Sequence, residues 1–221
     1  KGVPIIRGTT VTVNTYTNFS AAFVPDDTQY LTSYDKIVKN FTVDMKTYRD
    51  GEDIYVSPTA QKNDGGDGSP SQPLDLDTAI AYVRPGQKVI LLDGTYERQT
   101  KIDIPKGHDG TAGARKSLIA APGAKPIIDW AKKSEGVVLS GSYWHVKGID
   151  FTRTAGNTKG FTVGGSNNIV EDSRFYANGD TGLQISRTDD AEDKALWPSN
   201  NLILNCESYD NADPSNNNAD G

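Results

Sequence analysis

An internal repeat near the carboxyl end of the sequence limits the fold more than any other feature. The segment SNNIVEDSRFYANGD, which begins at Ser166, resembles SNNLILNCESYDNAD, which begins 33 residues later at Ser199, and six of the fifteen positions are identical. A fainter copy, SYWHVKGIDFTRTAGN, begins at Ser142, 24 residues before Ser166. Each copy has the pattern apolar strand, polar turn, apolar strand. Such a period is typical of repeat architectures, in which every unit packs on its neighbours.

A unit of 24 residues is too short to bury its own apolar face. Stacked units form one continuous core, and each strand then forms hydrogen bonds with the strands above and below it. The sequence therefore predicts an all-β protein, a right-handed parallel β-helix. The longer interval between the last two copies predicts that residues 187–198, which are charged and non-periodic, form a loop inserted between two coils.

Asparagines recur at fixed places in the repeat. Asn168 corresponds to Asn201, and Asn178 corresponds to Asn211. An asparagine that occupies the same turn in successive coils can form hydrogen bonds with that turn and stack on its copy. We therefore expect structural roles for these four residues rather than roles in ligand binding.

A short helix is expected before the coils. Asp75 can cap it, and Leu76, Ala79, Ile80 and Val83 follow the spacing of one apolar helix face, with Pro85-Gly86 as a stop signal. We expect this helix to cap the first end of the solenoid, where it would protect an exposed sheet edge. Residues 63–70, between a predicted strand at 53–56 and this helix, are rich in Asp and Gly, and a loop explains them better than a metal site.

The first fifty residues differ in composition from the rest of the chain. Residues 10–14 and 41–45 have the composition of short strands, and residues 25–27 have that of a turn. The sequence leaves open whether they form a leader subdomain or cover the end of the next domain. We predict a β-rich appendage over residues 1–50 and the first coils of a β-helix over residues 51–221, cut short at the carboxyl end.

Charge and composition exclude several classes of protein. The net charge is −6 and no basic stripe is present, which argues against nucleic-acid binding. No apolar run approaches the length of about 18 residues that a membrane span needs. Cys206 is the only cysteine, so an internal disulfide framework is excluded, and we expect it to be a small buried residue on the coil wall. The chain begins at Lys1 rather than Met, so we expect that a leader was removed, by processing or by design of the expressed sequence.

The last seventeen residues hold most of the candidate chemistry. They contain Glu207, Asp210, Asp213 and Asp220 among several amides. These are hard oxygen ligands suited to calcium, without the soft ligands that zinc prefers. On composition alone a solvated loop explains the stretch better than a metal site. The two histidines, His108 in a loop and His145 in a strand, form no recognisable catalytic set.

Four short motifs stand out in the last forty residues: Gly-Leu-Gln-Ile-Ser-Arg at 182–187, Asn-Asn-Leu at 200–202, Cys-Glu-Ser-Tyr-Asp-Asn at 206–211 and Asn-Ala-Asp-Gly at 218–221. Together they resemble family 9 of the polysaccharide lyases, which contains pectate lyases and some rhamnogalacturonan lyases. The resemblance covers roughly residues 53–221. It implies a calcium-dependent lyase that acts on acidic plant cell-wall polysaccharide, with Asp220 as a calcium ligand. It also places the remaining calcium ligands and a catalytic lysine beyond Gly221, so we expect this chain to be part of an enzyme.

The resemblance also implies a mechanism, a location and an assembly. Elimination across C4 and C5 of a uronate removes a weakly acidic proton beside a carboxylate, and a bound Ca²⁺ would neutralise the charge that develops there. A lysine near the cation would have a lowered pKa and could act as the base. We expect a secreted, periplasmic or cell-surface protein that acts as a monomer.

Arg187 and Lys194, in the inserted loop, are candidate substrate-binding residues. They could pair with substrate carboxylates. They could also pair with the acidic residues of the same loop, Asp189, Asp190, Glu192 and Asp193, and this second interpretation is favoured.

Two other functions stay open. A β-helix glycoside hydrolase would need two carboxylic acids that face one groove, and no spacing singles out such a pair. A non-catalytic β-helix that binds carbohydrate or serves as an adhesin is compatible with the absence of an identified base. The sequence does not separate galacturonan from a rhamnogalacturonan backbone as the substrate.

Overall fold

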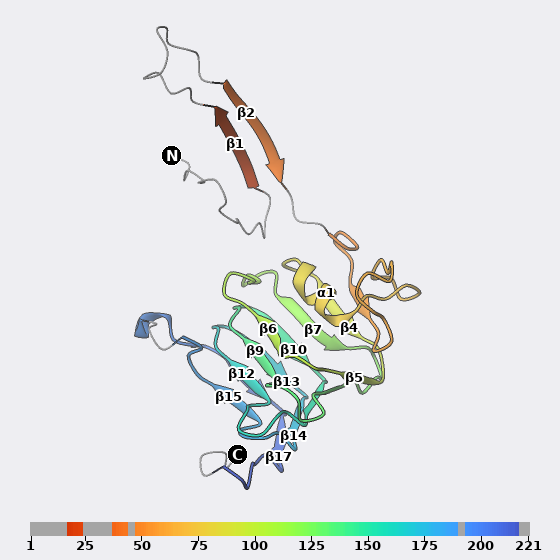
Figure 1. Cartoon of the computed structure of the whole chain (residues 1–221), viewed down its shortest axis with the longest axis vertical. Coiled ribbons are helices and arrows are strands. Elements are labelled where there is room, and N and C mark those ends of the chain that lie inside the picture. The colour runs from red at the N-terminus through yellow and green to blue at the C-terminus, as the bar shows by residue number, and fades with distance from the viewer. Residues whose placement is uncertain (1–16, 24–36, 44–46, 190–192, 217–221) are drawn as a thin grey trace. The chain divides into compact units, whose positions relative to one another are not determined.

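The computed structural model describes residues 17–23, 37–43, 47–189 and 193–216, and the chain divides into two units, Lys1–Lys46 and Thr47–Gly221 (Figure 1). In the first unit, strand β1 (Thr17–Phe23) pairs antiparallel with β2 (Ile37–Val43). The predicted strand at 41–45 overlaps the end of β2, whereas β1 was not predicted. The predicted strand at 10–14 and the turn at 25–27 lie outside the described residues.

The second unit is a stack of parallel strands in three sheets (Figure 1). The first sheet contains β3 (Ile54–Val56), β4 (Lys88–Leu91), β7 (Lys116–Ala120), β10 (Trp144–Lys147), β13 (Ile169–Glu171) and β16 (Leu202–Leu204). The second contains β5 (Thr95–Glu97), β8 (Ile127–Asp129), β11 (Asp150–Thr152), β14 (Arg174–Tyr176) and β17 (Glu207–Tyr209). The third contains β6 (Ile102–Ile104), β9 (Val137–Leu139), β12 (Phe161–Val163) and β15 (Leu183–Ile185). The predicted parallel β-helix is confirmed.

The pairing register aligns apolar residues in the interior of the stack. Val146 of β10 pairs with Val170 of β13, and Phe151 of β11 pairs with Phe175 of β14. The rings of Phe151 and Phe175 stack with centroids 5.3 Å apart, and Phe161 of β12 meets Phe151 edge-on at 5.0 Å. All five side chains are fully buried. Successive coils therefore share one core, as the short repeat requires.

The inserted loop lies between β15 and β16, where the sequence predicts it. Coils in the middle of the stack are offset by 24 residues, and the offset rises to 33 at this loop. The loop contains a 3₁₀ helix, η2 (Lys194–Leu196), and the carboxylate of Asp193 caps it by accepting a hydrogen bond from the N–H of Ala195 at 3.0 Å.

The recurring asparagines form two ladders, which confirms their structural roles. The Asn168 side chain accepts a hydrogen bond from the Trp144 N–H at 2.8 Å and donates to the Gly141 carbonyl at 3.1 Å. One coil later, Asn201 accepts from the Asn168 N–H at 2.8 Å. Asn178 and Asn211 repeat the arrangement, because Asn211 accepts from the Asn178 N–H at 3.1 Å. Each side chain thus satisfies backbone groups of the coil before it.

A single α-helix in the described residues, α1 (Leu76–Tyr82), lies where it was predicted, between β3 and β4. The Asp75 carboxylate caps it by accepting from the Thr78 N–H at 2.9 Å. Three residues that were predicted to form its apolar face, Leu76, Ala79 and Ile80, are buried, and α1 contacts β3 and β6, the first strands of two sheets. The helix ends at Tyr82, before Pro85-Gly86, because Val83 adopts an extended backbone.

A partly buried polar contact fastens α1 to the coils. His108 Nε2 lies 2.6 Å from the carbonyl oxygen of Ile80, and His108 Nδ1 lies 3.1 Å from Lys116 Nζ. Because a carbonyl only accepts, Nε2 carries the ring proton and Nδ1 accepts from the lysine. Burial lowers the pKa of His108 and lowers that of Lys116 to about 8.

Among the described residues, no helix is both long and apolar enough to cross a membrane.

Candidate functional site

The acidic residues near the end of the chain are dispersed over the part that the structure describes. Asp220, the predicted calcium ligand, lies outside the described residues. Within the described ranges, no group of three His, Cys, Asp or Glu residues is placed to hold a metal ion. Glu207 and Asp210 are exposed on and after β17. The Asp213 carboxylate accepts from the backbone N–H and the hydroxyl of Ser215, at 3.0 and 2.5 Å, and these hydrogen bonds lower its pKa.

Acidic residues occupy equivalent turns in successive coils. Asp180 follows β14, on the way to the third sheet, and its repeat counterpart Asp213 follows β17. Asp180 is buried, and its carboxylate lies 3.3 Å from Lys159 Nζ. The turns that lead into the third sheet therefore present hard oxygen donors, although Asp180 is already paired with a lysine.

The outer face of the third sheet is mainly polar. Asp103, Val138, Thr162 and Gln184 pair in register across β6, β9, β12 and β15. They alternate with core residues such as Phe161 and Val163, so their side chains point away from the core, where Asp103 is exposed and Thr162 is covered. The Oε1 atom of Gln184 is buried and has no hydrogen-bond partner among the described residues.

Hydrogen bonds fasten the inserted loop to the coils at its start and just beyond its end. The hydroxyls of Thr188 and Ser140 are 2.9 Å apart, and the Ser199 N–H donates to the Ser166 hydroxyl at 3.0 Å. Gly164, just after β12, makes room for the loop: a Cβ atom at this position would lie 2.4 Å from Thr188 Cγ2. A larger residue at 164 would therefore displace the start of the loop.

The structure brings the two predicted substrate-binding residues to one aromatic ring. The guanidinium carbon of Arg187 lies 5.4 Å from the centroid of the Trp197 ring, and Lys194 Nζ lies 5.8 Å from it, distances typical of cation–π contacts. Sequence reasoning missed Trp197. Its signal was present, since a tryptophan within a charged, non-periodic loop has no core to fill. Of the acidic residues predicted as alternative partners, Asp190 and Glu192 lie outside the described residues.

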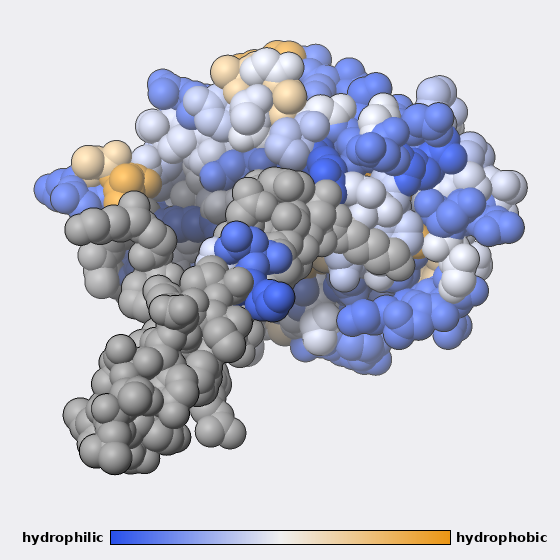
Figure 2. All heavy atoms as spheres, turned by 90° about the horizontal axis from the view of Figure 1, so that it is seen from above, coloured by the Kyte–Doolittle hydropathy of each residue, from blue (hydrophilic) through white to orange (hydrophobic). Residues whose placement is uncertain are grey.

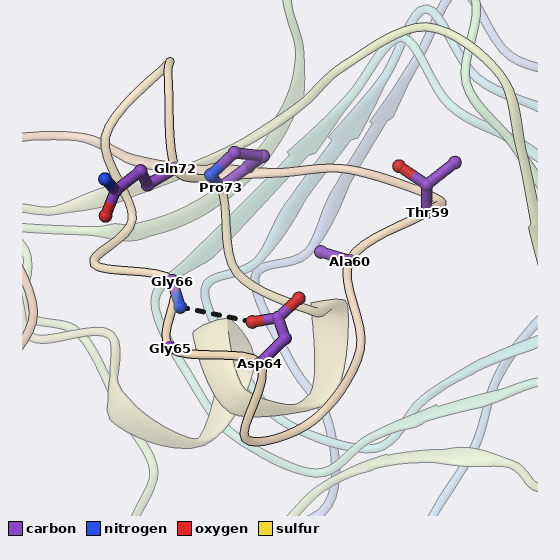
Figure 3. A pocket seen from close by; sticks show the side chains of 7 residues that line it. All are labelled: Thr59, Ala60, Asp64, Gly65, Gly66, Gln72 and Pro73. Atoms are coloured by element: carbon purple, nitrogen blue, oxygen red, sulfur yellow. Dashed lines mark hydrogen bonds between the residues drawn. The ribbon is translucent and has the colours of Figure 1, made fainter.

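A shallow hollow of about 430 Å³ lies before α1, away from the inserted loop in the sequence (Figure 3). Thr59, Ala60, Asp64, Gly65, Gly66, Gln72 and Pro73 line it. The Asp64 carboxylate accepts hydrogen bonds from the N–H groups of Gln61 and Gly66, at 2.8 and 3.1 Å, and these bonds lower its pKa. Asp64 thus organises its own loop, as expected for residues 63–70.

The remaining candidates take structural positions. His145 lies on β10, with Nε2 3.1 Å from Glu171 Oε1, and Lys147 Nζ lies 2.7 Å from the same oxygen.

Cys206 replaces Ser173 of the previous coil, and both side chains donate to a carbonyl two residues earlier. Cys206 is half-buried rather than fully buried, because it lies in the last described coil. Partial burial raises the pKa of its thiol.

Comparison with known proteins now identifies the coil stack. Residues 54–221 match the family model described as Pel9A-like, right handed beta helix region. The chain belongs to this Pel9A-like family. It is 58% identical over 208 residues to "Pectate lyase L" of Thermoclostridium stercorarium, covering 94% of this chain and 17% of that protein. It is 36% identical to "Pectate disaccharide-lyase" of Dickeya chrysanthemi, over 92% of this chain and 24% of that protein.

A solved structure of the Pel9A-like family agrees with the sequence matches. The "Crystal structure of pectate lyase Pel9A" superposes with a TM-score of 0.59 and 27% identity, covering 75% of this chain and 41% of that chain. The family assignment bears out the resemblance that the motifs indicated. The chain spans less than half the length of these relatives.

Proposed function

We propose that the protein containing this sequence is a pectate lyase that cleaves a galacturonan backbone by β-elimination. The identity of 58% along 94% of the chain to a protein named pectate lyase L carries this proposal. The Pel9A-like coil stack also supports this proposal, because its inserted loop carries two exposed cations that could attract an acidic polymer. We further propose that the protein acts outside the cell, where such polymers occur, and as a monomer.

Calcium is part of the proposal. When bound, Ca²⁺ would neutralise the substrate carboxylate beside the proton that is removed. We propose Asp220 as one ligand, on the basis of the Ala-Asp-Gly motif. The described residues fit this role only in part. Asp213 offers a hard oxygen in the turn after β17, but Ser215 already binds it and no three acidic groups gather in the described ranges.

Arg187 and Lys194 are proposed to pair with substrate carboxylates. Both lie against Trp197 in a loop that is fastened to the coils, on a chain whose net charge is −6. Two cations beside one aromatic ring can attract a carboxylate at short range, within a loop that also carries acidic residues. Arginine offers a planar pair of donors for a carboxylate, and lysine offers a point charge.

An absorbance assay on polygalacturonate tests the function. Elimination leaves a conjugated double bond, so we expect ultraviolet absorbance to grow with calcium and to stop when a chelator is added. Rhamnogalacturonan serves as the second substrate, and growth on that polymer alone would overturn the assignment to galacturonan. New reducing ends without absorbance would contradict elimination and favour a hydrolase. No change with either polymer would favour a binding module.

Substitution of Asp220 tests the calcium site separately. We expect Asp220→Ala to abolish calcium-dependent activity in the intact protein while circular dichroism shows the coils still folded. Asp67→Ala is the matched control, because Asp67 is an exposed carboxylate in the loop before α1. Equal activity of the Asp220 variant and wild type at every calcium concentration would remove Asp220 from the site.

A further inference from the structure

We propose that Leu196 and Trp197 form an apolar shelf that binds one uronic acid unit, and that Arg187 and Lys194 at this shelf select a free carboxylate over its methyl ester. This inference rests on the proposed function, since it names the form of galacturonan that the inserted loop recognises. Together these four residues are called the loop shelf.

The first step is the exposure of apolar surface on the loop. Leu196 is 65% exposed and Trp197 is 38% exposed. Figure 2 shows a mostly hydrophilic surface interrupted by a few apolar areas. A tryptophan has a large apolar face that favours burial, so its exposure in a fastened loop indicates a binding surface. The C–H face of a sugar ring is a suitable partner for such a surface.

The second step is the placement of charge. Arg187 and Lys194 lie 5.4 and 5.8 Å from the centre of the indole ring. A uronate that packs on the exposed part of the ring would carry its carboxylate within reach of both cations. A hydrogen bond between ionised partners is roughly twice as strong as one between neutral groups. A methyl ester removes that charge, so the shelf distinguishes the acid from the ester.

The third step is the support beneath the shelf. Thr188 contacts Ser140 and lies closely over Gly164, and the Asp193 carboxylate caps η2, which precedes Trp197 directly. The contacts of Thr188 hold the start of the loop against the ends of β9 and β12, and the Asp193 cap orders η2 within the loop. A preorganised surface loses less conformational entropy on binding, so a small contact area can still give measurable affinity.

Tryptophan fluorescence provides a direct test. The sequence has three tryptophans, and Trp130 and Trp144 are fully buried. A change in emission when a ligand binds therefore reports mainly on Trp197. The full chain is titrated in the presence of chelator with oligogalacturonate and with its methyl ester. We expect a saturable change with the acid and roughly tenfold weaker binding of the ester, a difference of about 1.4 kcal/mol.

Variants measured by calorimetry complete the test. We expect Trp197→Ala, and the double variant Arg187→Ala/Lys194→Ala, each to weaken oligogalacturonate binding roughly tenfold. Lys125→Ala is the control, because Lys125 is an exposed cation on another turn and its loss should change binding little. Equal affinity for acid and ester, or unchanged affinity in the loop variants, would overturn the proposal.

The two proposals can fail separately. The chelator stops calcium-dependent elimination, so the titration measures binding without catalysis. A protein that binds through the loop shelf and forms no unsaturated product would refute the lyase function and keep the shelf. A protein that forms the product while the loop variants bind and react like wild type would refute the shelf and keep the lyase.

Discussion

The two ends of the first sheet differ in what covers them. At the β3 end, Ile54 and Val56 are fully buried, although β3 is the terminal strand, because α1 packs there. At the β16 end, Ile203 is only half-buried. In the neighbouring third sheet, Ile185 of the terminal strand β15 is 44% exposed, whereas its partner Val163 one coil earlier is fully buried.

This difference shows that the strand pattern alone does not determine burial. The inward positions are apolar at both ends; α1 covers those at the β3 end, whereas β16 and β15 are the last strands of their sheets in the part of the chain that the structure describes. The candidate site residues also lie nearer to one end of the stack than to the other. The loop shelf lies between β15 and β16, and Asp220 follows β17 in the sequence. Thus α1 buries the inward residues at the β3 end, and the residues assigned to function lie nearer to the β16 end in the sequence.

The largest expected effect comes from a matched pair of core substitutions, one at each end. We expect Ile80→Ala to lower the free energy of unfolding by about 2–4 kcal/mol, because the Ile80 side chain of α1 is buried. Ile185→Ala should cost less than about 1 kcal/mol, because its side chain is already partly in water. Urea unfolding of the full chain measures both. Equal costs would break the comparison.

The next effect concerns the asparagine ladder. Asn168→Ala leaves the Trp144 N–H without its acceptor inside the stack, so we expect a cost of about 2 kcal/mol. Asn201→Ala removes the same contact one coil nearer to the β16 end, where the partly exposed turn lets water replace it. Its cost should be smaller, about 1 kcal/mol. A reversed order, measured by the same urea unfolding, would show that depth in the stack does not set the cost.

A smaller effect is expected from the two helix caps. Asp75→Ala removes the hydrogen bond to the Thr78 N–H at the start of α1, and its expected cost is about 1 kcal/mol. Asp193→Ala removes the corresponding cap of η2, which buries no residue, so its cost should stay below about 0.5 kcal/mol. Thermal unfolding of the two variants, side by side, checks whether capping matters more at the covered end.

The smallest effect is a dependence on pH at the β3 end. The folded pKa of His108 lies below its ordinary value of 6.5, so the unfolded chain binds the proton more readily. The contribution of His108 to the stability of the fold is therefore fully present above pH 6.5 and is lost as the pH drops below that value. The pKa of Lys116 is lowered from 10.5 to about 8, so its contribution to the stability of the fold decreases only as the pH falls from 10.5 to 8. Asp109 is the third ionisable group that acts on this contact.

The urea midpoint measured at pH 8, 6 and 5 tests this contact. His108→Gln should remove the decrease between pH 6.5 and 5, because glutamine does not titrate. The carboxylates with lowered pKa values, such as Asp64 and Glu171, lose their contribution only at lower pH. An unchanged pH profile in the variant would show that His108 is not the titrating group.

Most of the fold could be predicted from the sequence, because the repeat records it directly. The offset between copies predicted the length of a coil, the recurring asparagines predicted the ladders, and the capping residue Asp75 with the apolar spacing after it predicted α1. The site was harder to predict. Trp197 has no counterpart in the other copies, so the repeat says nothing of it, and its contact with Arg187 and Lys194 depends on how the loop folds back. Likewise, nothing in the spacing of His108 and Lys116 shows that they meet beneath α1.

Hydrogen exchange of the backbone amides in a chain of residues 1–221, in which β16 is the last described strand of its sheet, tests the contrast between the ends most directly. Amides in β3 should exchange about as slowly as those in β7, because α1 covers that end, and those in β16 should exchange roughly tenfold faster or more. Equal protection of β3 and β16, or faster exchange in β3, would contradict the account.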